Sequence, residues 1–372
     1  MPPVPVKRAE RLFKEALFRI LLLILRRGRS GLIPIEPDGV KSILFLRPDK
    51  LGDMITTIPA MHALKKRYPH LRVEIIASPR NMSLVKDDPL IDAVHIYAKN
   101  IFLDWPMMMR LRKKRFSVIF DPICHDSITG LLLSRIIGKR AIRAAARKLK
   151  YRTFYDFCEP YQPEGDDHSI DNSLLIFRVL GIDPESIDPY QPPYIPDDAR
   201  ERAVGFYSSL SQKKAIWIGI NIAAGSPTRS LPVSKYEAII NKISACHPDF
   251  RFLIFCTMEE RKRGLELLAR VSAPAALLPE NLNLQEAAAI LEKVHFFISP
   301  DTSLVHIAGL MKIPTVGLYS GHIRNYHFWK PYRQKHGSVI AKNFHDLQDI
   351  EPEQVAAEFE KVYCDSPYAQ AD

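Results

Sequence analysis

A single carboxylate stands where an apolar run ends and a helical pattern begins. In SILFLRPDKLGDMITTIPA (residues 42–60), Gly52 and Asp53 follow the loop after the apolar run. An aspartate at this position can cap the helix, because its side-chain oxygens accept the free N–H groups of the first turn. It can also take part in chemistry, because loops at the strand ends of open α/β sheets bind ligands. The residues alone favour capping.

A second loop, NIAAGSPTRSLP (residues 221–232), follows another apolar run. Its small residues, among them Gly225 and Ser226, allow backbone N–H groups to approach an anion, and Arg229 adds a positive guanidinium. The loop contains neither the GxxxxGK(S/T) nor the GxGxxG phosphate-binding motif. Phosphate binding and an ordinary connection are therefore equally compatible with it.

A third loop, SPDTSLVHIAG (residues 299–309), joins a strand pattern to a helical one. Asp301 and Thr302 stand at the expected helix start, Ser303 follows them, and His306 lies about one turn inside. A helix N-terminus with free N–H groups and nearby hydroxyls suits a diphosphate or a sugar. Capping by Asp301 or Thr302 is compatible with that role. His306 by itself is more typical of a half-buried structural histidine than of a catalyst.

The sequence predicts neither a metal nor another cofactor. It contains no HExxH, no DxD and no clustered histidines and cysteines, and its five cysteines form no CxxC pair. The odd, scattered cysteines argue against a disulfide framework and fit a reducing compartment. No GxSxG element indicates a serine hydrolase.

Strand and helix patterns alternate along the chain, which predicts βαβ units and parallel sheets. The expected strands cover residues 42–47, 72–78, 91–98, 116–123, 215–223, 251–257, 295–300 and 313–320. A segment rich in Pro and Asp, DPESIDPYQPPYIPDD, divides them into two groups. We therefore expect two α/β domains, residues 35–190 and 205–345, joined by a linker at 191–204 and followed by a C-terminal helix and tail at 346–372.

The chain is basic, with a formal net charge of +10, which favours anionic partners. Residues 1–34 form a leader whose basic residues, between positions 8 and 29, flank the apolar run Ile20 to Leu25. That run is far shorter than the ~18 apolar residues of a membrane-spanning helix. An amphipathic helix on an anionic membrane surface is expected, and a helix packed on the protein body is the alternative.

Together, the three loops resemble those of the bacterial heptosyltransferases, glycosyltransferase family nine. The resemblance runs over roughly residues 42–335, through LRPDKLGDMITTIPA, INIAAGSPTRSLP and SPDTSLVHIAGLMKIPTVGLYS. Four departures stand out. Arg229, Leu231 and Ser303 replace a usual lysine, tryptophan and glycine, and SGHIRNYHFWKPY stands where the family often has a GPT-like turn.

The resemblance implies a GT-B fold, in which two Rossmann-like domains face a central cleft. It also implies an inverting, metal-independent transfer of heptose from ADP-heptose to a lipopolysaccharide core or related glycan, with Asp53 as general base. Donor binding would fall to the second domain, through Gly225, Ser226, Arg229, Asp301, Thr302, Ser303 and His306, with Glu259 or Glu260 on the ribose. The departures leave another nucleotide sugar open as the donor.

Two basic clusters, MRLRKKRF (residues 109–116) and KRAIRAAARKLKYR (residues 139–152), lie in the first expected domain. Arg110, Arg112 and Lys113 are candidates for binding an anionic, lipid-linked acceptor, although a solvated helix face explains such clusters equally well. No stacked-aromatic RNA motif or helix-turn-helix pattern accompanies them, so we expect no nucleic-acid partner. The resemblance implies a cytoplasmic protein peripheral to the inner membrane.

Three other functions remain open from the sequence. A GT-B sugar-nucleotide epimerase would turn over its donor without any acceptor. A catalytically idle scaffold would keep the fold and bind lipid through the leader, although Asp53, Arg229, Asp301 and His306 are all retained. A nucleic-acid binder would show steeply salt-dependent affinity.

Overall fold

The computed structural model describes residue 28 and residues 34–161, 167–210, 215–225, 227–334 and 336–370. The expected leader lies outside these residues except at Gly28 and Pro34, and so does the predicted membrane contact through residues 8–29. Within the described ranges, no helix is both long and apolar enough to cross a bilayer.

The first domain is built on a sheet of six parallel strands in the order β3-β2-β1-β4-β5-β6. The strands are β1 (Ser42–Arg47), β2 (Arg72–Ala77), β3 (Ala93–Ile96), β4 (Val118–Asp121), β5 (Ile142–Lys148) and β6 (Phe157–Pro160). The helices are α2 (Leu51–Ile55), α3 (Ile58–Arg67), α4 (Ile101–Lys114), α5 (Ile128–Ile137) and α6 (Ser169–Val179).

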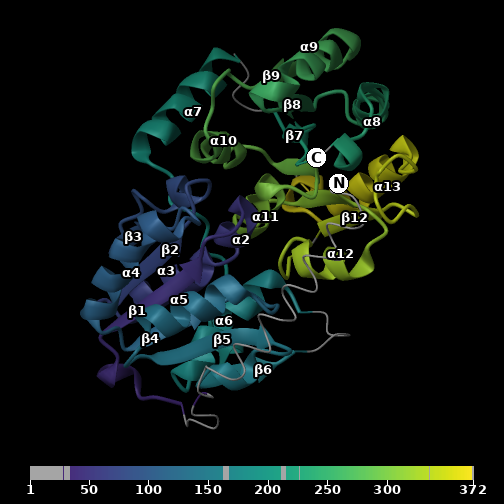
Figure 1. The fold of residues 1–372 in the computed structure, drawn as a ribbon. Coiled ribbons are helices and arrows are strands. Elements are labelled where there is room, and N and C mark those ends of the chain that lie inside the picture. Colours follow the sequence, from purple (N-terminus) through teal and green to yellow (C-terminus); the bar gives the residue numbers. More distant parts are fainter. Residues whose placement is uncertain are drawn as a thin grey trace.

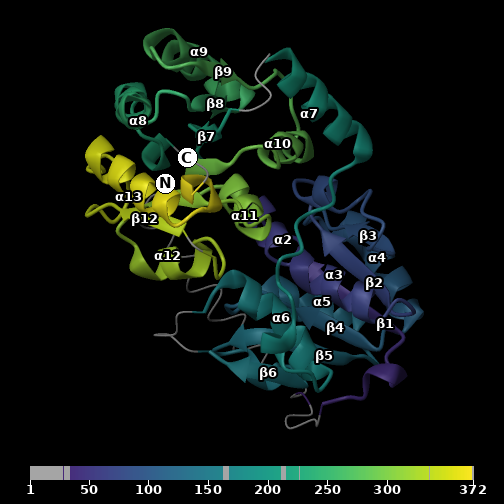
Figure 2. The same cartoon turned by 180° about the vertical axis from the view of Figure 1, so that it is seen from behind.

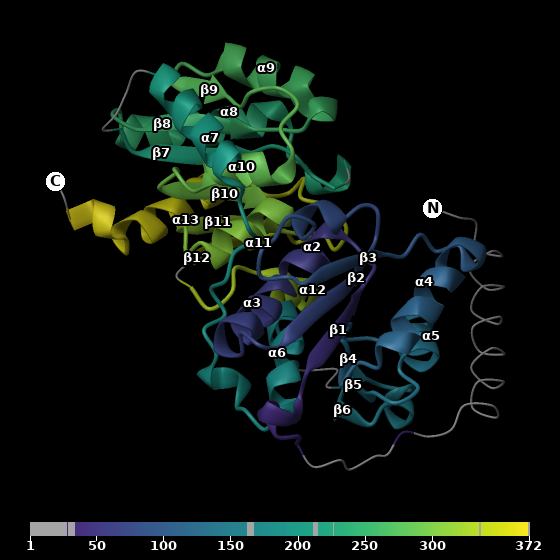
Figure 3. The same ribbon diagram turned by 90° about the vertical axis from the view of Figure 1, so that its left-hand side faces the viewer.

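Helices cover both faces of this sheet, with α4 and α5 on one side and α3 and α6 on the other (Figure 3). Successive side chains of a strand point to opposite faces, so β1 contributes to two cores. Leu44 and Leu46 pack with α4 and α5, whereas Ile43 and Phe45 pack with α3 and α6. Burial on both faces explains why β1 is a continuous apolar run rather than an alternating one.

The second domain repeats this plan with parallel strands in the order β12-β11-β10-β7-β8-β9. The strands are β7 (Trp217–Asn221), β8 (Arg251–Phe255), β9 (Ala275–Leu277), β10 (Phe296–Pro300), β11 (Thr315–Tyr319) and β12 (His336–Ile340). The helices are α7 (Asp197–Ser209), α8 (Val233–Cys246), α9 (Arg261–Arg270), α10 (Leu284–Leu291), α11 (Ser303–Leu310), α12 (Ile323–Trp329) and α13 (Pro352–Cys364). Short 3₁₀ turns are η1 (Pro37–Gly39), η2 (Met82–Leu84), η3 (Arg152–Phe154), η4 (Pro184–Ser186), η5 (Pro227–Arg229), η6 (Met258–Glu260) and η7 (Pro367–Gln370).

The predicted α/β class and the two sheets are confirmed, while several elements differ from expectation. The sequence patterns did not predict β5, β6, β9 or β12, and α7 begins inside the expected linker and packs on α10. The basic stretch 139–152 contains β5, and two of its basic side chains are paired with aspartates of the first domain. Arg143 contacts Asp156 at 2.9 Å, and the fully buried Lys148 contacts Asp121 at 2.9 Å.

The two domains face each other across their carboxyl strand ends, and α2 of the first lies beside α11 of the second (Figures 1 and 2). A second junction joins the start of α6 to the segment after α12. There, Nδ1 of His168 accepts the N–H of Ile170 at 3.1 Å, and Nε2 donates to the carbonyl oxygen of Lys330 at 2.7 Å. The ring of Tyr332 lies 4.8 Å from the His168 ring.

We predict that this junction makes the protein sensitive to acid. Burial lowers the pKa of His168 from its ordinary 6.5 to about 3, so the folded protein keeps the imidazole neutral where the unfolded chain takes up a proton. Stability should therefore fall as pH drops below about 6.5, with His168 contributing up to about 1.4 kcal/mol per pH unit. Urea unfolding at several pH values measures the slope, which should become shallower in His168→Gln.

The exposed His70 supplies the control, since His70→Gln should leave the slope unchanged. Equal slopes in the wild type and His168→Gln would contradict the assignment to His168.

Candidate active site

Asp53 lies in the first turn of α2, at the carboxyl end of β1. Its Oδ2 accepts the N–H of Lys50 at 3.3 Å, so the capping role expected from the sequence is present. Its Oδ1 lies 3.4 Å from Arg47, and its side chain is 21 % exposed. The carboxylate is therefore oriented by the protein while part of it still faces the space between the domains.

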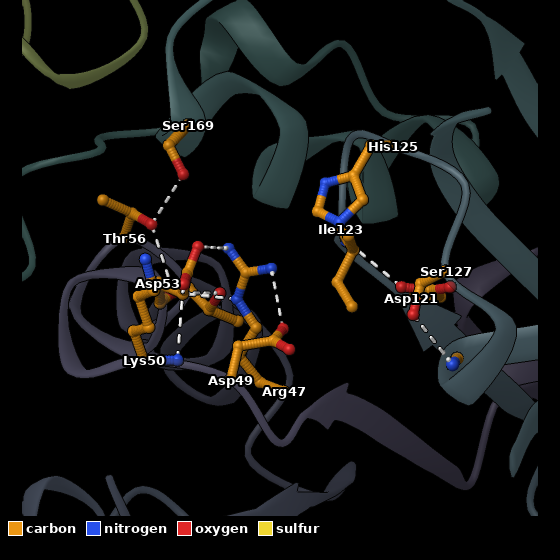
Figure 4. Close-up of polar contacts among 12 residues, drawn as sticks. Arg47, Asp49, Lys50, Asp53, Thr56, Asp121, Ile123, His125, Ser127 and Ser169 are labelled. Carbon is orange, nitrogen blue, oxygen red and sulfur yellow. Dashed lines mark hydrogen bonds and ion pairs between the residues drawn. The ribbon is translucent and has the colours of Figure 1, made fainter. Parts of the chain in front are cut away.

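Arg47 holds the residues after the carboxyl end of β1 in place, a role that the sequence did not predict. The guanidinium is buried and lies between the carboxylates of Asp49 and Asp53 (Figure 4), at 3.7 Å and 3.4 Å. Its Nε also donates to the carbonyl oxygen of Asp53 at 2.9 Å. Because a buried cation needs opposite charge, Arg47 holds both acids at the mouth of β1. The available signal was a charged residue closing an otherwise apolar strand.

Two further titratable groups face the same strand ends. Burial raises the pKa of Asp49, against the lowering effect of Arg47, and the charges of Asp53 and Asp121 raise it further. Burial lowers the pKa of His125, which lies in the loop after β4. Below that loop, Lys148 donates to the carbonyl oxygens of Ile123 and His125 at 2.6 Å and 3.1 Å, which holds the loop in place.

In the second domain, the ends of β7 and β10 are joined by polar contacts. The buried Asn221 donates from Nδ2 to the hydroxyls of Ser299 and Thr302, at 2.9 Å and 3.0 Å. Ser303 then opens α11, and no side chain caps the N–H groups of its first turn. N–H groups in this position can bind an anion, and that role stays a prediction of the sequence.

Asp301 connects the loops of the second domain. Its Oδ2 lies 3.5 Å from Arg229 and accepts an N–H of Asn325 at 3.2 Å. Its Oδ1 lies 3.9 Å from Nε2 of His306. Arg229 and Asp301 border a cavity of about 190 Å³. The sequence predicted both residues, but it gave no signal that they pair.

His306 lies at the contact between the domains. A Cβ on Gly52 would stand 3.4 Å from Cδ2 and 3.5 Å from Nε2 of His306, so the ring packs directly on the backbone of α2. Burial lowers the pKa of His306, although the charges of Asp301 and Asp53 act in the opposite direction. A neutral imidazole therefore separates the carboxylates of the two domains.

The comparisons with known proteins assign this arrangement to a family. The family model described as glycosyltransferase family 9 (heptosyltransferase) matches residues 110–358, which is more than half of the chain. The chain belongs to glycosyltransferase family 9. It is therefore a glycosyltransferase, and the two facing parallel sheets are its GT-B fold.

Similar proteins agree with this assignment. The lipopolysaccharide core heptosyltransferase OpsX of Haemophilus influenzae is 22 % identical over 351 residues, covering 91 % of this chain and 92 % of its own. A glycosyltransferase family 9 structure from Veillonella parvula covers 91 % of this chain and 100 % of its own, with a TM-score of 0.74 at 18 % identity. The E. coli heptosyltransferase WaaC with ADP covers 88 % of this chain and 99 % of its own, with a TM-score of 0.66 at 14 % identity.

The remaining predicted donor residues of this glycosyltransferase lie in different surroundings. Gly225 has open space beside it, whereas Ser226 lies outside the described residues. Glu259 is exposed, and its neighbour Glu260 accepts the N–H of Ala224 at 3.2 Å. The geometry favours Glu260 over Glu259 as the acid beside the loop after β7.

The predicted acceptor residues do not lie with Asp53. Helix α4 runs from the carboxyl end of β3 back to the amino end of β4. Its last turn therefore lies at the amino ends of the strands, opposite the carboxyl ends where α2 begins. Arg110 and Lys113 are exposed there, and Arg112 donates to the carbonyl oxygen of Ile136 at 3.2 Å. Their position gives no support to a role beside Asp53, and their assignment stays a prediction.

Within the described ranges, no group of three or more His, Cys, Asp or Glu side chains is arranged to hold a metal ion. The charged groups at the cleft are instead paired with one another, as in the contacts of Arg47 with Asp53 and of Arg229 with Asp301.

We predict that the contact between Gly52 and His306 is required for transfer. The γ carbons of Gly52→Val would extend into the ring of His306, because even a Cβ stands at van der Waals distance from it. The variant should separate α2 from α11 and lower the transfer rate at least about tenfold, the effect expected of a small misplacement of reacting groups. Nucleotide binding, which the sequence assigns to the second domain, should be retained.

Gly205→Val is the matched control, because a Cβ at Gly205 meets nothing within 4 Å. Transfer at the wild-type rate by Gly52→Val would show that the close contact is not needed.

Proposed function

We propose that this chain transfers heptose from ADP-heptose to a lipopolysaccharide core or related envelope glycan, with inversion and without a metal. One observation carries the proposal. Asp53 of the first domain and the group of Arg229, Asp301 and His306 in the second come together where α2 packs on α11. Support for the donor comes from the E. coli structures of WaaC with ADP and with ADP-2-deoxy-2-fluoro heptose. Support for the acceptor comes from the relatives named as lipopolysaccharide heptosyltransferases.

In the proposed reaction, an acceptor hydroxyl attacks the anomeric carbon from the face opposite the diphosphate. The new carbon–oxygen bond forms as the bond to the diphosphate breaks, and the electron pair leaves with the diphosphate. The carboxylate of Asp53 takes the hydroxyl proton. Arg47 supports this step by holding Asp53 through both its carboxylate and its carbonyl oxygen.

The second domain stabilises the leaving group in this proposal. The uncapped N–H groups of α11, with Thr302 and Ser303, face developing negative charge, and Arg229 supplies a cation. Gly225 and Ser226 would add backbone N–H groups. Asp301 accepts hydrogen bonds from sugar hydroxyls, and Glu260, or Glu259 beside it, contacts the ribose. His306 stays neutral beside Asp301 because burial lowers its pKa.

A lipid-linked acceptor would place the protein at the cytoplasmic face of the inner membrane, with residues 8–29 as the proposed contact. A truncation that begins near Ile35 tests this by liposome sedimentation. Loss of sedimentation on truncation supports the contact, and unchanged sedimentation removes it.

We predict that Asp53→Asn lowers the transfer rate by roughly 10²–10⁴-fold while leaving nucleotide affinity unchanged. Asparagine keeps an oxygen that accepts the N–H of Lys50, and Asp49 remains as an ion-pair partner of Arg47, so the helix start is preserved while the base is lost. Initial rates with donor and acceptor measure the effect, and Asp38→Asn, at an exposed acid in η1 before the amino end of β1, is the control. A rate equal to that of the wild type would remove Asp53 from the mechanism. Absence of transfer in the wild type, despite nucleotide binding, would favour the idle scaffold.

The nucleotide is tested by calorimetry with ADP, UDP, GDP and CMP. We expect selective ADP binding, weakened about tenfold in Arg229→Ala because a charge-assisted contact is lost. Arg229→Lys keeps the positive charge and should retain most of the affinity. Preference for another nucleotide would keep the transfer chemistry and change the donor.

A further inference from the structure

The cavity beside Asp301 has walls that the proposed reaction does not use. It lies between η5, α12 and the loop after β12, and α12 occupies the stretch where the family often has a GPT-like turn. Besides Arg229 and Asp301, it is lined by the side chains of Leu318, Ser320, His322, Asn325, Phe344, His345 and Leu347. The segment whose sequence departs from the usual family pattern therefore contributes directly to a space next to the proposed donor site.

The walls of the cavity are held in place by the backbone. Gly321 donates its N–H to the carbonyl oxygen of Asn343 at 2.7 Å, and Leu347 donates to that of Thr228 at 3.2 Å. A Cβ on Gly321 would stand 2.9–3.0 Å from three carbonyl oxygens of residues 341–343, so only glycine allows this approach. These contacts join the start of α12 and η5 to the same loop, and the cavity is formed before any ligand arrives.

Polar groups with unused hydrogen-bonding capacity line the cavity. Nδ1 of His322 accepts the N–H of Asn325 at 3.1 Å, which leaves the ring proton on Nε2. Asn325 uses its Nδ2 on Asp301. Within the described part of the chain, the hydroxyl of Ser320, Nε2 of His322 and Oδ1 of Asn325 have no hydrogen-bond partner. The cavity thus offers a hydroxyl, a donor and an acceptor at fixed positions.

The remaining lining suits a sugar better than a diphosphate. Asp301 would repel an anion, and its carboxylate and Oδ1 of Asn325 both accept hydrogen bonds from hydroxyls. Phe344 is 52 % exposed, and its ring lies 4.5 Å from the ring of His322, so an apolar surface faces the polar groups. At about 190 Å³ the cavity is smaller than the ~300–1,000 Å³ typical of ligand pockets, a size that suits one monosaccharide better than a whole nucleotide.

We propose that this cavity is the subsite for the transferred sugar and that Ser320, His322 and Asn325 select the sugar that the enzyme accepts. The inference rests on the proposed sugar transfer and names the residues that would decide its donor. Asp301 joins the subsite to the reaction, because one oxygen faces the cavity and the other lies 3.9 Å from His306, which packs on Gly52 beside Asp53.

The test separates sugar binding from nucleotide binding. Calorimetry with the full chain compares each nucleotide with its sugar conjugate, using ADP with ADP-heptose and ADP-glucose, UDP with UDP-glucose, and GDP with GDP-mannose. The readout is the ratio of the two affinities in each pair. We expect Asn325→Ala to reduce this ratio about tenfold for the preferred pair, because hydrogen bonds to the sugar are lost, while the nucleotide affinity stays within about twofold.

Two further variants make the result specific. Ser320→Leu adds bulk to the cavity wall while leaving Asp301 itself unchanged, and should reduce the same ratio. Ile323→Ala lies on the same helix, at a side chain that is 51 % exposed and outside the cavity lining, and should leave both affinities unchanged. Thermal unfolding of each variant confirms that the chain is folded before its affinity is compared.

The outcomes distinguish this inference from the proposed donor. One outcome is that the preferred pair is instead UDP with UDP-glucose or GDP with GDP-mannose. If both cavity variants then lose the tighter binding of the sugar nucleotide, the subsite assignment stands and ADP-heptose is overturned as the donor. Equal weakening of nucleotide and sugar nucleotide would assign the cavity to the diphosphate and overturn the inference. An unchanged ratio in both variants would also overturn it, as would a wild-type protein in which no sugar conjugate binds more tightly than its nucleotide.

Discussion

The arrangement of the whole site depends on the close packing of His306 on the backbone at Gly52. The proposed base, Asp53, belongs to the first domain, whereas Arg229 and the uncapped start of α11 belong to the second. Reaction between two bound substrates requires both sets of groups within contact distance, and the α2–α11 junction brings them there. A Cβ at position 52 would already be in van der Waals contact with His306, so a side chain larger than that of alanine would hold the domains apart.

Charges buried at the carboxyl strand ends follow a common pattern. Arg47 and Lys148 are both buried, and each is paired with aspartate and bonded to backbone carbonyl oxygens. Taking ions out of water costs several kcal/mol per ion, so such pairs are poor sources of stability compared with apolar packing. Their effect is to fix the positions of neighbouring groups. Arg47 fixes the acids after β1, and Lys148 fixes the loop after β4 that carries His125.

The departures from the family pattern have different structural explanations. Leu231, where tryptophan is common, is buried in the core of the second domain, so this change concerns packing. Arg229 replaces lysine, lies 3.5 Å from Asp301 and keeps its side chain 47 % exposed. The SGHIRNYHFWKPY segment contributes α12, whose His322 and Asn325 reach the cavity beside Asp301. Of these changes, α12 alters the surface available to a ligand the most.

The sequence by itself determined the α/β class, the central strands and the three loops that carry the site. Long apolar runs such as Ile43 to Leu46 are buried on both faces, so their composition reports their place in the middle of a sheet. Strand β5 escaped detection because Arg143 and Lys148 gain partners only from distant residues, Asp156 and Asp121. The contact of Arg47 with Asp53, by contrast, depends on the local turn between β1 and α2. As with β5, only the tertiary structure decided that Asp301 pairs with Arg229 and that Arg112 lies at the amino end of the sheet. Spacing along the chain reports local structure, whereas these contacts arise where strand ends from separate parts of the chain converge.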